Sequence, residues 1–369
     1  MKKLGAWCAG MALLCGLLLT GCGGQPGGEA QPSPQPSPQE DTIKPTFELE
    51  GDVDPYTGLA RAEDYPEGVR GTAVMINNVR TALPQSGIND ADVIYEMVTE
   101  SGITRMMAVY RDYKAMPVVG PLRSARDQHV QLMIPLDSLY AHIGTSTYAA
   151  EMLETYRYLD TKAIDGKYKT YYWIDGERRK TRGQEHCVYM DGTTFSEAVD
   201  KYELETASEP APIFNFVRYD QSDRELTGGP AQELYIRFSS YADSIFTYNA
   251  EDGRYYKSEF GQPQIDANTG EQYSADNVLL LFADITKYPD GVLSHVNFDA
   301  QGAGLYFCNG RYEPVRWMKG KPNMPLRIVD AEGNETDVPI NPGQTYVAVA
   351  GMDQIEHCRV DGKGLAELG

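Results

Sequence analysis

The sequence has few basic residues, few cysteines and few long apolar runs. Its 369 residues contain 53 acidic side chains against 33 lysines and arginines, which gives a formal net charge of −20. Non-specific nucleic-acid binding needs a basic surface that displaces the counterions of phosphates, so this class of function is excluded. A polytopic membrane protein is excluded as well, because the chain lacks a series of apolar stretches of about 20 residues.

The composition is that of a folded protein. Hydrophobic residues make up 41% of the chain and charged residues 23%, and there are 25 tyrosines against 10 phenylalanines and 3 tryptophans. The length suits two ordinary domains of about 100–200 residues each. Abundant tyrosine is typical of strands and of partly wet surfaces. The composition therefore predicts a soluble, acidic, sheet-rich protein.

The N-terminus has the features of a cleaved export signal. Basic residues 2–3 precede an apolar run, 4–19, that is too short to span a bilayer. Residues 19–22, Leu-Thr-Gly-Cys, resemble the lipobox of bacterial lipoproteins, a family in which the chain is cut before a cysteine that is then acylated. We expect residues 1–21 to be a lipoprotein signal peptide. The mature protein would then lie outside the cytoplasm, anchored to the cell membrane by lipid on Cys22; the alternative is a plain signal peptide.

A proline-rich segment follows the predicted anchor. Residues 22–45 repeat Gln-Pro-Ser-Pro and contain almost no apolar side chains after the cysteine. Such a segment prefers extended conformations, at about 3.1 Å per residue, and cannot build a core. We interpret 22–45 as the lipidated cysteine and a disordered tether.

The first folded half, residues 46–208, mixes strands with helices. Hydrophobic alternation and turn residues predict strands at 72–77, 92–100, 103–110 and 139–143. Helical patterns cover 123–134 and 146–158, and a capping box at 194–197 predicts the start of a further helix. This pattern indicates an α/β domain, a layered sandwich of sheet and helices.

The second half, residues 209–369, is predicted to be smaller and mostly antiparallel β. Short Tyr-, Val- and Phe-rich runs alternate with turn signals, of which Asp252-Gly253 and Asn309-Gly310 indicate two hairpins. The likeliest boundary between the halves is residues 203–211. The predicted fold class is therefore α/β, or α+β.

Three cysteines remain after the predicted processing: Cys187, Cys308 and Cys358. A Cys308–Cys358 disulfide and buried free thiols are both compatible with their positions. No pair has the spacing of a metal site, so we expect no metal and no cofactor.

Polar side chains are densest between residues 77 and 126. Arg123 and Arg126 follow a Gly-Pro turn and are predicted to share a helix face, where two guanidinium groups near a helix start attract an anion. Glu96 and Glu100 share one face of the second predicted strand, and either carboxylate is a suitable partner for Arg105 or Arg126. Two interpretations follow: an ion-pair network that fixes packing, or a ligand-binding cleft.

Histidine is scarce, and the sequence has no P-loop, nucleophile elbow or His-Glu-x-x-His pattern. His142 precedes a loop of small polar residues that includes Ser146, a possible acid–base or nucleophile pair. If the protein is an enzyme, which the sequence leaves uncertain and does not favour, the candidates for catalysis are His142, Glu96, Glu100 and His186.

Several of these segments occur together in a known family. Asn77-Asn78, Pro84 to Gly87, Ala91 to Glu96, Gly102 to Arg105, Gly120 to Arg126 and His142 to Ser146 resemble the pattern of the YerB-like bacterial lipoproteins, also labelled DUF3048. The resemblance is strong over about residues 70–190, and the second half is similar to the family's smaller C-terminal domain. It implies an α/β fold and an envelope location, but no reaction.

The favoured hypothesis is a non-catalytic envelope lipoprotein that binds an anionic small molecule or a wall component. Arg105, Arg123 and Arg126 would hold the anion, and the residues expected to orient it are Asn77, Asn78, Ser86, His142 and Ser146. The alternatives are a cell-wall-active hydrolase that uses His142 or a glutamate as acid or base, and an interaction scaffold that uses the Tyr-rich β half. The expected partners are the membrane and this ligand, and no nucleic acid.

Overall fold

The computed structural model describes residues 47, 51–158, 162–165 and 171–368. The predicted signal peptide, Cys22 and the tether lie outside the described residues. Within the described ranges, no helix combines the length and the apolar character needed to cross a membrane.

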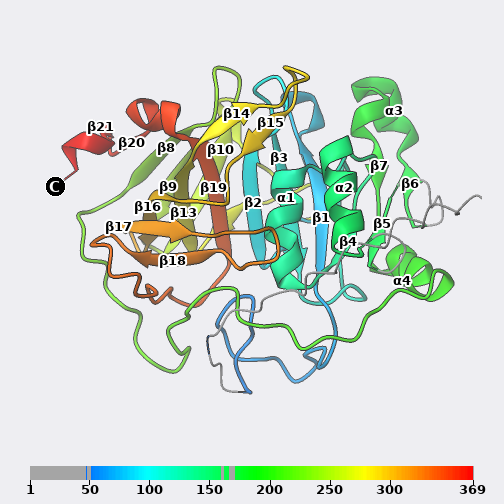
Figure 1. Cartoon of the computed structure of the whole chain (residues 1–369), viewed down its shortest axis with the longest axis horizontal. Coiled ribbons are helices and arrows are strands. Elements are labelled where there is room, and N and C mark those ends of the chain that lie inside the picture. The colour runs from blue at the N-terminus through cyan, green and yellow to red at the C-terminus, as the bar shows by residue number, and fades with distance from the viewer. Residues whose placement is uncertain (1–46, 48–50, 159–161, 166–170, 369) are drawn as a thin grey trace, which may run out of the picture. The chain divides into compact units, whose positions relative to one another are not determined.

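A ten-stranded sheet forms the centre of the fold (Figure 1). Across the sheet its strands are β18 (Arg327–Asp330), β17 (Arg311–Met318), β16 (Gln301–Cys308), β13 (Asn277–Ala283), β19 (Thr345–Gly351), β2 (Val93–Val98), β3 (Thr104–Tyr110), β1 (Thr72–Asn78), β4 (Leu139–Ala141) and β5 (Ala163–Ile164). The predicted strands at 72–77, 92–100, 103–110 and 139–143 are confirmed, with small shifts at their ends. Most of these strands are buried on both faces, which explains their nearly continuous apolar sequences.

Strands from both halves of the sequence pair in this one sheet. β19 lies between β13 and β2 and is parallel to both. The strands that precede and follow the boundary expected near residue 208 are therefore joined by main-chain hydrogen bonds. The hairpin of β9 (Asp243–Asn249) and β10 (Arg254–Glu259) turns at Asp252-Gly253, and that of β16 and β17 turns at Asn309-Gly310, as the turn residues predict.

Different layers cover the two faces of the large sheet. Helices α1 (Asp127–Met133) and α2 (Thr147–Thr155) cover one face of β1 to β4, and lie in front of the sheet in Figure 1. The other face packs on a seven-stranded sheet. Its strands are β8 (Glu233–Arg237), β9 (Asp243–Asn249), β10 (Arg254–Glu259), β11 (Gln262–Pro263), β12 (Ser274–Ala275), β20 (Arg359–Val360) and β21 (Lys363–Gly364). The α/β class with smaller antiparallel sheets is thus confirmed.

The remaining elements are short. They are the pairs β6 (Trp173–Ile174) with β7 (Val188–Tyr189) and β14 (Ile285–Lys287) with β15 (Ser294–Val296), helices α3 (Gly176–Arg182) and α4 (Gly192–Lys201), and 3₁₀ turns η1 (Arg80–Ala82), η2 (Ile134–Leu136), η3 (Gln184–His186), η4 (Met352–His357) and η5 (Leu365–Glu367). The helix predicted from the capping box is α4. Its cap is Asp191, whose side chain accepts from the Thr194 amide, so it begins earlier than predicted.

One helix prediction is wrong in its first turn. The pattern predicts a helix over 123–134, but α1 begins only at Asp127, and Arg126 is its extended N-cap residue. Arg123 and Arg126 therefore do not share a helix face. Main-chain hydrogen bonds to neighbouring strands hold residues 123–125 extended instead, so tertiary pairing overrides the local preference.

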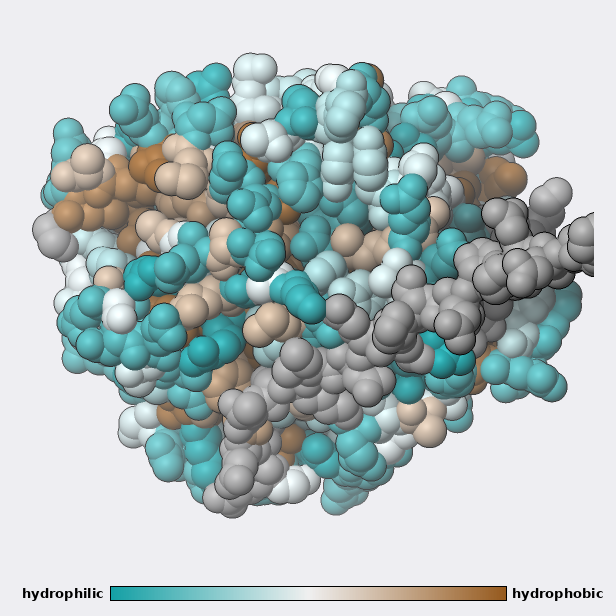
Figure 2. Space-filling model, in the orientation of Figure 1, coloured by the Kyte–Doolittle hydropathy of each residue, from teal (hydrophilic) through white to brown (hydrophobic). Residues whose placement is uncertain are grey.

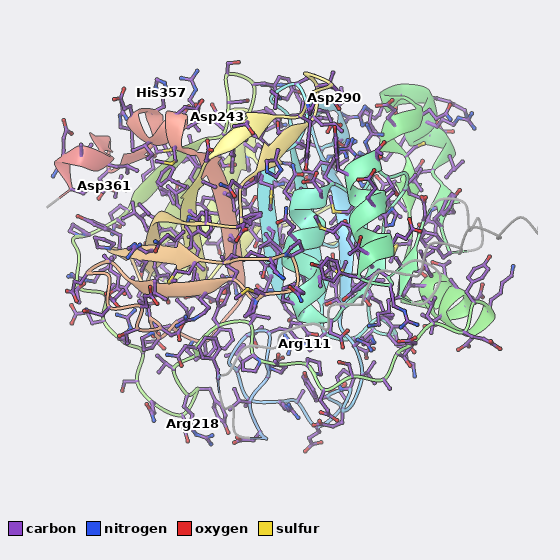
Figure 3. All side chains as sticks on the ribbon, in the orientation of Figure 1. Arg111, Arg218, Asp243, Asp290, His357 and Asp361 are labelled. Atoms are coloured by element: carbon purple, nitrogen blue, oxygen red, sulfur yellow. The ribbon has the colours of Figure 1, made fainter. Side chains whose placement is uncertain are left out.

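Ion pairs fasten the chain segments at one end of the sheet. Arg111 pairs with both Asp54 and Asp92, and Arg218 pairs with Asp52 at 2.9 Å. Figure 3 shows Arg111 and Arg218 low in the view, and His357 and Asp290 at the opposite, upper end. Residues 51–54 are thereby tied to the amino end of β2 and to the loop near residue 218.

The surface seen in Figure 2 is mostly hydrophilic, with hydrophobic side chains gathered on its left side. An apolar hollow of about 530 Å³ lies between β16, β17 and the C-terminal turn η5. Its lining includes Leu305, Pro314, Ile355, Leu365 and Leu368.

Candidate functional site

Seven strands of the large sheet end at the same edge. The pairings make β17, β13, β19, β2, β1, β4 and β5 run in one direction, so their carboxyl ends lie together. Open α/β sheets commonly bind ligands outside this edge, where neighbouring strands diverge. Most of the polar residues selected from the sequence follow one of these strand ends.

The segment 120–126 fills the gap where β1 and β4 diverge. The Arg123 amide donates to the Met75 carbonyl at 2.9 Å, and the Ile143 amide donates to the Arg123 carbonyl at 3.0 Å. This pairing places Arg123 and Arg126 at the carboxyl edge, next to the start of β3, which carries Arg105.

Arg105, Arg126 and Glu100 form a compact group that we call the arginine fork. Arg126 donates from Nε and Nη2 to the two carboxylate oxygens of Glu100, at 3.0 and 2.9 Å. Arg105 donates from Nη2 to the same carboxylate. The side chain of Arg105 is 1% exposed and that of Glu100 17%, so the fork is deep but reaches the surface at its carboxylate.

The fork has one positive charge in excess, because it contains two guanidinium groups but only one carboxylate. Burial raises the pKa of Glu100, but the attraction of Arg105 and the hydrogen bond from Arg126 outweigh it, so that pKa lies below its usual value. Burial and the nearby charge of Arg126 lower the pKa of Arg105 to about 9. Both effects are expected where positive charge is only partly compensated.

Arg123 lies beside the fork with a partner of its own. Its Nη2 is 3.0 Å from Oε2 of Glu185, whose side chain is 67% exposed, so this pair is at the surface and weak. Asn77 Nδ2 donates to the Glu185 carbonyl and lies 2.8 Å from Nδ1 of His186. Burial and the charge of Arg123 lower the pKa of His186. The structure therefore brings Asn77 and His186 next to Arg123.

Several buried polar atoms around the fork make no hydrogen bond to any residue that the structure describes. They are Nε of Arg105, Nε of Arg123, the Tyr140 hydroxyl and Nδ1 of His129. Nε2 of His129 lies 3.2 Å from the Arg105 carbonyl, and burial lowers the pKa of His129 to about 3, so the ring is neutral. Buried polar atoms without partners are uncommon, and a bound polar group is one way to satisfy them.

His142 is buried at the end of β4, with its ring against Tyr140 at 4.9 Å between centroids. Its Nδ1 lies 3.0 Å from the Gly144 carbonyl and 3.2 Å from the Thr145 hydroxyl. Ser146 caps α2, where its hydroxyl accepts from the Ala149 amide at 3.2 Å. The local contacts thus give Ser146 a role in starting the helix.

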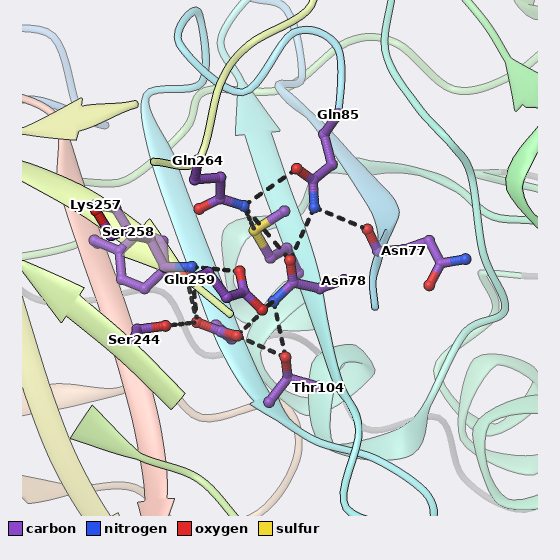
Figure 4. Close-up of polar contacts among 12 residues, drawn as sticks. Asn77, Asn78, Gln85, Thr104, Ser244, Lys257, Ser258, Glu259 and Gln264 are labelled. Carbon is purple, nitrogen blue, oxygen red and sulfur yellow. Dashed lines mark hydrogen bonds and ion pairs between the residues drawn. The ribbon is translucent and has the colours of Figure 1, made fainter. Parts of the chain in front are cut away.

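Other predicted site residues lie away from the fork. Ser86 pairs with Gly120 through two main-chain hydrogen bonds. Asn78 and Glu96 point to the other face of the sheet, where they join a sealed group that also contains Lys257, Glu259 and Tyr346, here called the core network (Figure 4). Of the two glutamates proposed to pair with the arginines, Glu100 does so, whereas the contacts of Glu96 are those of the core network.

The core network is almost completely buried. Asn78 Nδ2 donates to Glu96 at 2.6 Å and to Glu259 at 2.8 Å. Lys257 Nζ lies 2.8 Å from Glu259 and 3.7 Å from Glu96, and Tyr346 donates to Glu96. Burial raises the pKa of Glu259 to about 7, against the attraction of Lys257.

Sequence reasoning missed an aromatic wall beside the fork, made of Tyr148, Tyr288 and His295. Tyr148 and Tyr288 are stacked with 3.5 Å between ring centroids. The Tyr288 hydroxyl donates to Asp127 at 2.8 Å, and His295 Nδ1 lies 3.0 Å from that hydroxyl. The β14–β15 hairpin supplies two of these rings from far along the chain, and no local pattern indicates where it docks.

The described residues include no group of His, Cys, Asp or Glu side chains arranged to hold a metal ion. Cys187, Cys308 and Cys358 are buried free thiols. Cys308 and Cys358 therefore do not form the disulfide that was one of the two alternatives.

Comparison with known proteins places these features in a family context. A model described as the N-terminal domain of a protein of unknown function (DUF3048) matches residues 56–205, and the corresponding C-terminal domain model matches residues 234–347. A Bacillus subtilis (strain 168) protein named "Putative lipoprotein YerB" is 27% identical over 304 residues, which cover 80% of this chain and 85% of that protein. The crystal structure of YerB from Bacillus subtilis matches with a TM-score of 0.69 at 23% identity, covering 81% of this chain and 96% of that chain, and shows the same fold.

Proposed function

Because the chain belongs to the DUF3048 family, we propose that it is a membrane-anchored lipoprotein that binds an anionic ligand at the arginine fork and catalyses no reaction. The name of the YerB relative, a lipoprotein, supports membrane anchoring, and the charge and position of the fork support anion binding.

The anchor would be lipid attached to Cys22, which follows the apolar run 4–19 and precedes the proline-rich segment. With its net negative charge, the protein would be repelled by anionic headgroups, so the lipid would have to provide the membrane affinity. Mass spectrometry of the N-terminal peptide tests this: an acylated Cys22 supports it, and an uncleaved or unmodified N-terminus contradicts it.

The observation that carries the binding proposal is the charge balance of the fork. Two buried guanidinium groups share one carboxylate at the edge of the mixed sheet where the carboxyl ends of β1, β2 and β4 lie, in a protein that is otherwise strongly acidic. Such a group retains local positive potential that an anion from solution would neutralise. Arg105 Nε and the Tyr140 hydroxyl, which have no hydrogen-bond partner among the described residues, provide further donors nearby.

Calorimetry with simple anions tests the proposal. Full-length protein in a non-ionic detergent is titrated with sodium acetate and with sodium sulfate at constant ionic strength. We expect Arg126→Ala to weaken binding of the preferred anion by about tenfold or more, because it removes a two-bond guanidinium contact worth about 1.5–3 kcal/mol. Arg126→Lys keeps the charge but not the two parallel bonds. Its affinity for the anion should therefore lie between those of the wild type and Arg126→Ala.

The matched control is Arg218→Ala, an arginine that also pairs with an acidic residue but lies at the opposite end of the sheet. Its binding should equal that of the wild type. The proposal is wrong if the wild type binds neither anion, or if the Arg126 and Arg218 variants bind equally well.

A further inference from the structure

The bonds to Glu100 form a complete carboxylate-recognition site. Arg126 contacts both oxygens side-on, and Arg105 adds a third bond. Two parallel N–H donors match the planar geometry of a carboxylate, which is the reason that arginine is favoured for recognising this group. Glu100 thus demonstrates which chemical group the fork accepts.

The two guanidinium groups are held in place without Glu100. Arg105 Nη1 donates to the Ser124 carbonyl at 2.9 Å, and Arg126 Nη1 donates to the Ala125 carbonyl at 2.8 Å. If the Glu100 side chain turned outward, these bonds would keep both groups aimed at the vacated position. A preorganised site of this kind loses little entropy when a ligand replaces an internal group.

Glu100 is placed so that its side chain can move while its backbone stays. It follows the end of β2, in a turn that is closed by the Ile103 amide donating to the Glu100 carbonyl at 2.9 Å. The Ser239 hydroxyl holds the same turn by donating to the Gly102 carbonyl at 2.6 Å. The side chain is partly exposed, so rotation toward solvent breaks its contacts with the two arginines and with the neighbouring Thr99 side chain.

The aromatic wall lies next to this exposed edge. The Ser294 amide, on the hairpin that carries the wall, donates to the Thr99 carbonyl at 2.6 Å, one residue from Glu100. On the other side, Tyr288 binds Asp127, which directly follows Arg126. The side chain of His295 is 40% exposed. A sugar ring attached to the carboxylate would therefore have aromatic side chains to pack against.

We infer that Glu100 occupies the place of a ligand carboxylate, and that the ligand is a carboxylate-bearing ring compound of the acidic-sugar class. This inference rests on the proposed function. When the ligand binds, its carboxylate takes over the bonds from Arg105 and Arg126, and its ring lies beside Tyr148 and Tyr288. The internal glutamate then competes with the ligand and limits its affinity.

The test compares Glu100→Gln with the wild type, using glucuronate, glucose and acetate as probes of the full-length protein in detergent. Glucose has the ring without the carboxylate, and acetate has the carboxylate without the ring. We expect Glu100→Gln to bind glucuronate about tenfold more tightly or better, because the competing charge is gone. Glucuronate should bind more tightly than acetate in both proteins, and glucose should not bind measurably.

Glu185→Gln is the matched control, since Glu185 also pairs with an arginine beside the fork but lies outside it. Its affinity should equal that of the wild type. Tyr148→Ala should reduce the preference for glucuronate over acetate. If the Glu100→Gln variant does not fold, Glu100→Asp can be tested in its place. It keeps the charge but moves the carboxylate away from the arginines, so its gain in affinity should be smaller.

The outcomes separate this inference from the proposed function. If the wild type binds anions but the Glu100 variants gain no affinity, binding at the fork stands and the exchange with Glu100 is wrong. If sulfate binds more tightly than glucuronate, the ligand class is wrong. If the wild type and every Glu100 variant ignore all of the anions, both the inference and the proposed function fail.

Discussion

The arginine fork and the core network lie on opposite faces of the same strands, and their charges are unbalanced in opposite directions. The fork has two guanidinium groups and one carboxylate, whereas the core network has two carboxylates and one ammonium group. The fork has partly exposed members at the sheet edge. The core network is sealed between two sheets (Figure 4).

The two groups differ in how their surplus charge can be neutralised. A surplus carboxylate can take up a proton, and the pKa of Glu259, raised to about 7, makes this possible near neutral pH. A surplus guanidinium group cannot be neutralised in the same way, because even the lowered pKa of Arg105, about 9, leaves it charged. The sealed network therefore needs only a proton, whereas the fork needs an anion, which its position at the edge can admit.

The largest expected effect is on the core network. Lys257→Met removes the ammonium group that pairs with Glu96 and Glu259, and breaking a buried ion pair in this way costs about 3–5 kcal/mol. We expect the free energy of unfolding, measured by urea denaturation at pH 7, to fall by that amount. The loss should be smaller at pH 5, where Glu259 is protonated in the folded protein.

Lys180→Met is the control for this change, because Lys180 also pairs with a glutamate but its side chain is 73% exposed. Its unfolding curve should match that of the wild type. A Lys257 variant as stable as the Lys180 variant would show that the core network does not depend on its cation.

A smaller effect is expected in the pH dependence of stability. The pKa of Glu259 is about 7 in the folded protein and near the ordinary 4.5 when unfolded, so between these values the folded state holds a proton that the unfolded state has lost. This contribution is fully present below pH 4.5 and is lost as the pH rises toward 7. Glu259→Gln should remove this decline from the curve of unfolding free energy against pH.

The exposed Glu177 provides the comparison, since Glu177→Gln should leave the slope between pH 5 and 7 unchanged. If the curves of unfolding free energy against pH were parallel for the wild type and the Glu259 variant, Glu259 would not be the group that holds the extra proton. The core network would then not neutralise its surplus charge by protonation, as the comparison with the arginine fork requires.

Much of the fold could be predicted from local patterns. The alternation in β2 places Ile94 and Val98 on one buried face and Val93, Tyr95 and Met97 on the other. The structure confirms this, because the two sets pack in separate hydrophobic clusters on opposite faces of the large sheet. The turn residues at 252–253 and 309–310 also identify their hairpins correctly. These features depend on residues that are close together in the sequence, so they can be predicted from the sequence alone.

The site was only partly predictable, because its geometry depends on distant segments. Glu96 and Glu100 share a face only as long as the strand continues, but β2 ends at Val98 and Glu100 lies in the turn beyond it. The two glutamates therefore reach different groups on different faces. No local pattern indicates that Tyr288 binds Asp127, which is 161 residues earlier in the sequence.

The position of β19 constrains the order of events during biosynthesis. This strand, Thr345–Gly351, fills the space between β13 and β2, so neither neighbour has its full set of hydrogen bonds until synthesis has reached residue 351. Earlier in synthesis, two apolar strand edges remain open to wrong partners. Nascent chains of this protein should therefore depend on protection from aggregation until β19 emerges.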